Sequence, residues 1–194
     1  MKAPAPKYNK ILPPVGNHLA RLIEILYIGT EKSEQYGNES YKVRVKWELP
    51  NEKAVFKEGD QPKPFVVGKK MTLSMNSKST LRPFVEGMLG VSLKDEEAFA
   101  FDVDDLLGKD CMVYVTIDEK GENTYVNVNN ATPVPKGMVC PPPFNPLNIL
   151  SYEKWNEDFF QKLPEFLRKE ISATPEYRKM KGEPNVDVND VPFD

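Results

Sequence analysis

The feature that most constrains the fold is a strict alternation over residues 41–49. Every second position is apolar or aromatic, and the positions between are charged: the first set is Tyr41, Val43, Val45, Trp47 and Leu49, and the second is Lys42, Arg44, Lys46 and Glu48. A period of two, with β-branched and aromatic residues on one side, is typical of a strand with one buried face. We therefore predict a strand whose apolar face, including Trp47 and Tyr41, joins a core.

The other face of this strand carries three cations in succession, Lys42, Arg44 and Lys46. A strand that needed only solubility would mix its charges. A face of one sign favours a negatively charged ligand, and a plain solvated face is the alternative explanation.

The preceding segment, residues 19–28, is apolar on both faces apart from Arg21 and Glu24. We expect this strand to bend and to serve two sheets, as the first strand of a small closed barrel does. The polar loop 29–40 joins the two strands and carries one aromatic residue, Tyr36.

Alternation and capping signals predict the remaining elements of the body. They are a strand at 65–76, a helix at 80–89 ended by Gly90, an acidic loop at 91–109 that packs on the body, and strands at 111–117 and 124–130. The order of three strands, one helix and two strands predicts a mainly β protein with an OB-fold, a five-stranded Greek-key barrel.

Composition suggests how the chain is divided. We expect a flexible basic arm at 1–15, the OB-fold nucleic-acid-binding domain at 16–137, a proline-rich linker at 138–150, a helical extension at 151–181 and a disordered acidic tail at 182–194. Apolar residues recur every three or four positions between Trp155 and Leu167, and Pro164 divides this helical segment in two. The helices could dock on the barrel or bind a partner.

Charge is distributed unevenly although the net charge is only −3. Residues 1–93 hold 15 Lys/Arg and 9 Asp/Glu, a net +6, whereas residues 94–194 hold 11 and 20, a net −9. This asymmetry indicates a basic binding body followed by an acidic region.

The two cysteines, Cys111 and Cys140, lack metal-ligand spacing, so we expect them to be reduced, with Cys111 in a strand core. No apolar run is long enough to span a membrane, and no apolar segment follows Met1. We therefore expect a protein without a secretory signal that acts in the cytoplasm.

The sequence offers little for catalysis. His18 is the only histidine, and its place at the start of a predicted strand suggests a capping or surface role. Because no phosphate-binding glycine loop, paired-cysteine metal motif or nucleophile elbow is present, we expect no catalytic residue, no metal site and no cofactor. A metal-dependent nuclease built from scattered carboxylates remains an alternative, and so does a protein–protein adaptor.

Binding of single-stranded nucleic acid requires cations that follow the phosphates and aromatic rings that stack on bases. Both kinds of residue occur on the predicted outer face and on nearby loops. The candidate nucleic-acid-binding residues are Tyr36, Lys42, Arg44, Lys46, Phe56, Phe65, Lys69, Lys70, Lys78, Arg82, Tyr114 and Tyr125. Stacking does not distinguish DNA from RNA.

Three segments, YKVRVKWELP, MTLSMNSKSTLRPFVEGMLG and CMVYVTIDEKGENTYVNVNNATPVPKG, resemble phage-encoded OB-fold single-stranded DNA-binding proteins. The resemblance covers most of residues 16–137. It implies binding without strong sequence preference during DNA replication, recombination or repair, in the cytoplasm of the host, and it is compatible with a homo-oligomer.

The end of the sequence is similar to the acidic tip of bacterial single-stranded DNA-binding proteins, which finishes Asp-Ile-Pro-Phe. Here the matching residues are followed by one more acid, Asp194. This similarity implies recruitment of replication, recombination or repair proteins through Asp187, Asp190, Val191, Pro192, Phe193 and Asp194.

Overall fold

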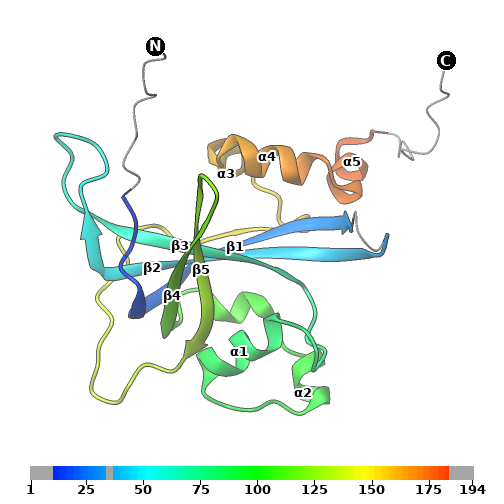
Figure 1. Cartoon of the computed structure of the whole chain (residues 1–194). Coiled ribbons are helices and arrows are strands. Elements are labelled where there is room, and N and C mark those ends of the chain that lie inside the picture. Colours follow the sequence, from blue (N-terminus) through cyan, green and yellow to red (C-terminus); the bar gives the residue numbers. More distant parts are fainter. Residues whose placement is uncertain (1–10, 34–36, 184–194) are drawn as a thin grey trace.

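Strand β1 is the centre of the fold, and three other strands pair with it (Figure 1). The structure is a computed structural model that describes residues 11–33 and 37–183. The strands are β1 Gly16–Lys32, β2 Glu39–Ala54, β3 Lys63–Thr72, β4 Asp110–Lys120, β5 Asn123–Thr132 and β6 Asn148–Leu150. They form one sheet in the order β3-β2-β1-β4-β5, with β6 added parallel to β1.

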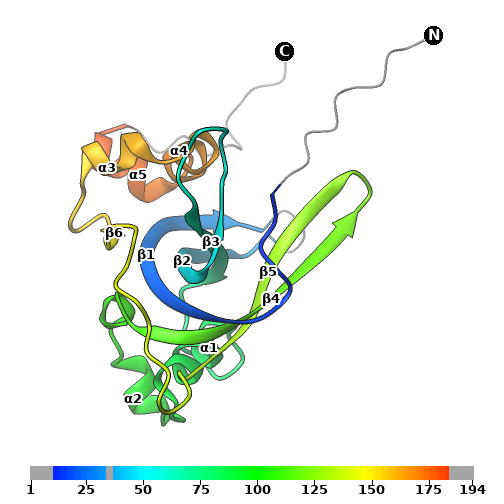
Figure 2. The ribbon, with the colours of Figure 1, turned by 90° about the vertical axis from the view of Figure 1, so that its left-hand side faces the viewer.

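The apolar character of both faces of β1 has a structural reason. Leu22 and Ile25 belong to the main core, whereas Leu26 and Ile28 belong to a second core on the other side. Register shifts in the β1–β2 ladder, at Leu22/Glu24 and at Tyr27/Gly29, interrupt the alternation. Figure 2 shows how strongly β1 curls. The predicted bend and the two buried faces are observed, but the second face of β1 packs on helices and not on a second sheet.

The main core lies under helix α1, Leu81–Leu89, which connects β3 to the acidic segment before β4. Trp47 is 0% exposed, and its ring lies 5.8 Å from that of Phe84, centroid to centroid. Gly90 ends α1 in the left-handed conformation, with a φ of 70°. The buried face of β2, this helix and its glycine stop are therefore confirmed, except that Tyr41, also predicted for the core, is only half-buried.

The acidic segment before β4 forms α2, Asp95–Phe99, and the 3₁₀-helix η1, Val103–Leu106. Ala98, Val103 and Leu106 reach the main core, as expected of a segment that packs on the body. Tyr27 of β1 donates a 2.7 Å hydrogen bond to Asp104.

Three helices follow β6: α3 Glu157–Lys162, α4 Glu165–Ser172 and α5 Pro175–Lys181. Leu167 and Ile171 of α4 pack on Leu26 and Ile28 of β1 and form the second core. The docked alternative for the helical segment is therefore the observed one.

Some boundaries differ from the prediction. β2 continues to Ala54 because the β2–β3 ladder resumes after a register shift between Leu49 and Lys53. β3 ends at Thr72 rather than at position 76.

His18 is buried, not at the surface. One ring nitrogen lies 3.1 Å from a carboxylate oxygen of Glu52, and the other lies 2.8 Å from the carbonyl oxygen of Pro14.

The mainly β class is confirmed, and the sheet is open. Among the described residues no hydrogen-bonded ladder joins β3 to β5, although the Lys69 ammonium of β3 donates a 2.8 Å hydrogen bond to the Val128 carbonyl of β5. None of the helices in the described ranges is long and apolar enough to cross a membrane.

Candidate nucleic-acid interface

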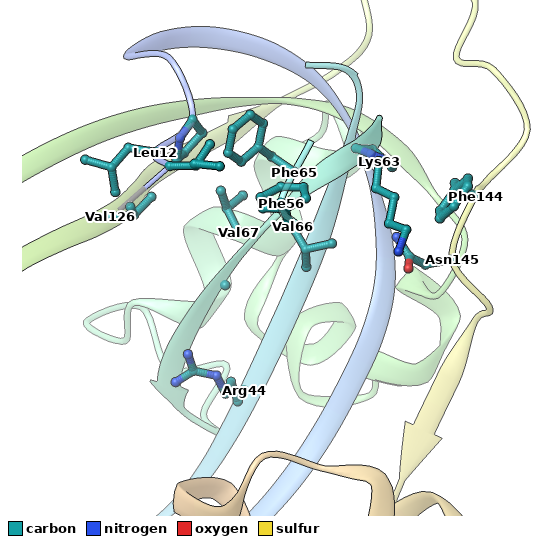
Figure 3. Close-up of a pocket in the computed structure, with 14 residues that line it drawn as sticks. Leu12, Arg44, Phe56, Lys63, Phe65, Val66, Val67, Val126, Phe144 and Asn145 are labelled. Atoms are coloured by element: carbon teal, nitrogen blue, oxygen red, sulfur yellow. The ribbon is translucent and has the colours of Figure 1, made fainter. Parts of the chain in front are cut away.

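A pocket of about 510 Å³ opens beside β3 (Figure 3). Its walls come from four stretches far apart in sequence: the start of the described chain, the β2–β3 region, β5 and the segment before β6. The lining residues with large or charged side chains are Ile11, Leu12, Arg44, Phe56, Lys63, Phe65, Val66, Val67, Val126, Phe144 and Asn145. A mostly apolar pocket with a few convergent polar groups is the usual form of a ligand site.

The turn between β2 and β3 places an aromatic ring at this pocket. Phe56 meets Phe65 edge to face, with 5.2 Å between ring centroids. Phe65 is buried and belongs to the main core, whereas Phe56 is 43% exposed. Both were predicted as binding residues; the structure leaves Phe56 as the accessible ring and Phe65 as its support.

A buried carboxylate places a second ring. Glu48 accepts hydrogen bonds from the backbone N–H groups of Phe144 (2.9 Å) and Asn145 (2.8 Å), and from the Asn145 side-chain amide (2.7 Å). This fixes the segment before β6 on the outer face of β2, where Phe144 is 60% exposed. The sequence did not predict Phe144 and Asn145 as pocket residues. Glu48 stands in a row of charged residues on β2, and nothing in that row indicates that a distant segment covers it.

Arg44 is the cation of β2 that reaches the pocket. Its guanidinium carbon lies 5.8 Å from the ring centroid of Phe166 on α4. The Arg44 Nε is buried and has no hydrogen-bond partner among the described residues. Lys63 also lines the pocket and is paired with Asp60 at 2.9 Å.

The other cations predicted on the outer face of the sheet already have polar or acidic partners within the protein. Lys46 forms an ion pair with Glu24, and the Lys42 ammonium donates a 2.9 Å hydrogen bond to Thr72. Lys70 is paired with Glu31 at 3.0 Å and with Glu170 of α4 at 2.5 Å. Partial burial lowers the pKa of Lys70, but the hydrogen bonds to the two carboxylates outweigh it and the pKa is raised overall.

Lys69 and Arg82 hold the fold together. Lys69 lies 5.3 Å from the Phe84 ring centroid and donates to β5, and burial lowers its pKa. Arg82 is buried and bonds Glu86 at 3.0 Å and Asp95 at 2.6 Å, which ties α1 to α2.

Four further predicted residues lie away from the pocket or beyond the described ranges. Lys78 lines a separate polar hollow with Thr72 and Ser74. Tyr114 is half-buried on β4, and Tyr125 is exposed on β5 beside the pocket residue Val126. Tyr36 lies outside the described residues, as do all the predicted partner-binding residues at 187–194.

The described side chains include no cluster of three or more His, Cys, Asp and Glu residues arranged to hold a metal ion. The pocket is lined by a cation, Arg44, at the end nearest the C-terminal helices and by two exposed rings, Phe56 and Phe144, toward the other end (Figure 3). No protein-family model matches this chain, and no curated protein matches it in sequence.

Proposed function

We propose that this protein binds single-stranded DNA through the pocket beside β3, without strong sequence preference. The observation that carries the proposal is that one pocket is lined by Arg44, which has no carboxylate partner among the described residues, and by two exposed rings, Phe56 and Phe144. A guanidinium binds phosphate, and a flat ring stacks on any base.

The fold also supports the proposal of single-stranded DNA binding. The strand order β3-β2-β1-β4-β5, with α1 between β3 and β4, is the connectivity we propose to be that of an OB-fold. The approach of β3 to β5 through Lys69 is compatible with a barrel closed by side chains. Together with the sequence resemblance, this supports a phage-type single-stranded DNA-binding protein of the host cytoplasm.

A titration with oligonucleotides tests the proposal. Purified protein is mixed with labelled single-stranded and duplex DNA of equal length at two salt concentrations. We expect tighter binding of the single strand, because a paired base cannot enter the pocket, and a salt slope of about −0.7 per phosphate contact. Equal or tighter binding to duplex contradicts the proposal. Failure to bind either DNA favours the adaptor, in which the pocket takes a peptide.

We also propose that the acidic end recruits replication, recombination or repair proteins, with Phe193 as an apolar anchor in an acidic peptide. Deletion of 183–194 should leave folding intact and abolish capture of such enzymes. Phe193→Ala should lose the partners while DNA affinity stays close to that of the intact chain. If the shortened protein captures partners as before, the acidic end has no recruiting role.

A further inference from the structure

We infer that Phe166 on α4 is a base-stacking residue, so that the C-terminal helices form part of the nucleic-acid interface. This inference rests on the proposed function and extends it to a part of the chain that the sequence assigned only to docking or partner binding. The ligand class is an unpaired nucleobase of a single strand that also contacts Arg44.

The first observation is that Phe166 does not serve the core. Leu167 and Ile171 of the same helix are fully buried in the second core and account for the amphipathic character of α4. Phe166 is 59% exposed. A single exposed apolar residue is ordinary on a protein surface, so exposure alone would assign nothing.

The second observation is the position of this ring. Phe166 lies against Arg44, whose guanidinium lines the pocket, and Figure 3 shows Arg44 on the side of the pocket that faces the C-terminal helices. A strand whose phosphate binds the Arg44 guanidinium would therefore lie next to the Phe166 ring. Aromatic rings beside a cation that follows the backbone are the arrangement that single-strand binding uses.

The third observation is that α4 is held on the sheet at this place. Glu170 pairs with Lys70 of β3 at 2.5 Å, one helical turn from Phe166. Glu165, the other acid beside the ring, pairs with Lys169 at 2.6 Å. Because both carboxylates have a cation partner, they repel a nearby phosphate less than two unpaired carboxylates would.

The test compares two phenylalanines of similar exposure. Phe166→Ala should weaken single-stranded DNA binding by about 5- to 150-fold, the range for one stacked base. Phe99→Ala removes a ring that is 65% exposed on α2, in the acidic segment, and should leave the affinity unchanged. Neither change should lower the melting temperature, since neither ring is in a core. Phe166→Trp should retain binding.

The salt dependence separates stacking from a role through Arg44. Loss of a stacked base lowers the affinity at every salt concentration and leaves the salt slope unchanged, whereas loss of a phosphate contact flattens the slope. If the wild-type protein binds single strands and Arg44→Ala weakens binding, but Phe166→Ala does not, the inference is wrong and the proposed function stands. A flattened slope for Phe166→Ala also overturns it, because Phe166 would then only position Arg44. If the wild-type protein binds no single strand, both fail.

Discussion

Glu48 and Asn145, separated by 97 residues, are joined by two hydrogen bonds: the Glu48 carboxylate accepts from the backbone N–H of Asn145 at 2.8 Å and from its side-chain amide at 2.7 Å. Glu48 is 1% exposed. A buried carboxylate is stable only when hydrogen-bonded or paired, and here the bonds hold the chain before β6 against β2. The pocket wall at Phe144 depends on this contact.

Glu48→Ala should therefore reduce both stability and binding. Three N–H donors lose their acceptor, and we expect a loss of about 1–3 kcal/mol in the free energy of unfolding, together with weaker single-strand binding as Phe144 leaves its place. Denaturant unfolding and an oligonucleotide titration measure the two effects. Glu122→Ala, at the exposed β4–β5 turn, is the matched control. If a folded Glu48→Ala protein binds DNA as the wild type does, Phe144 does not contribute to the binding site.

Trp47→Ala should destabilise the fold by about 3–5 kcal/mol, as truncation of a large core residue does. Trp47 is fully buried and packs on Phe84 of α1. Chemical unfolding followed by circular dichroism measures the loss. A variant that keeps wild-type stability but no longer binds DNA would mean that the inner face of β2, and not the outer one, forms the site.

Trp47 and Glu48 show what local pattern can and cannot predict. The alternation of β2 identifies Trp47 as a core residue because a period of two needs only neighbouring positions. The same alternation assigns Glu48 to the solvent, yet a segment almost a hundred residues later covers it. Burial by a distant segment leaves no trace in the strand that is covered, so Phe144 and Asn145 could not be predicted from β2.

The C-terminal helices were predicted from local pattern, but their contacts with the sheet were not. Their apolar spacing predicted α3 and α4. The apolar pattern of β1 suggested a second sheet, and the second face is covered by these helices instead. Nothing local indicated that Phe166 and Glu170 would contact Arg44 and Lys70. The helix α5 lies within the predicted helical extension at 151–181, but it was not predicted as a separate helix although a signal existed. Thr174 caps it, with its hydroxyl 3.4 Å from the Tyr177 N–H, and Pro175 follows at the first helical position.

Stability should fall as the pH rises above about 9. Burial, with a smaller contribution from Asp110, raises the pKa of Cys111 from 9.0 to about 12. Above pH 9 the unfolded chain loses this thiol proton while the folded chain keeps it. The stability present below pH 9 is therefore lost progressively towards pH 12, at roughly 1 kcal/mol per pH unit.

Denaturant unfolding at pH 8, 9 and 10 measures this alkaline loss. Cys111→Ala is the comparison, since it removes this titrating group and should reduce the pH dependence even though the truncation lowers stability overall. Cys140, whose pKa is raised by burial to about 11, should account for part of the loss that remains. The raised pKa of Tyr41, about 12 because of burial, adds its own loss only above pH 10. An identical pH dependence in the two proteins would assign the alkaline loss to other groups.

The three cations of β2 should contribute unequally to DNA binding, although the sequence gives them equal standing. Lys46 is paired with Glu24, so a phosphate that binds Lys46 must compete with a carboxylate already in contact. Arg44 has no carboxylate partner among the described residues, and its Nε is buried without an acceptor. A phosphate at Arg44 therefore gains an interaction without displacing one, and it fits the planar donor array of the guanidinium.

Arg44→Ala should consequently weaken single-strand binding more than Lys46→Ala, and it should reduce the magnitude of the salt slope by about 0.7, one phosphate contact. Arg44→Lys keeps the charge but not the planar fork, and it should recover only part of the affinity. Titrations at three salt concentrations measure affinity and slope together. Glu24→Gln provides a further check, because release of Lys46 from its partner should tighten binding and steepen the slope. Equal losses for Arg44→Ala and Lys46→Ala, with no gain from Glu24→Gln, would show that the ion pair at Lys46 does not restrict its contact with DNA.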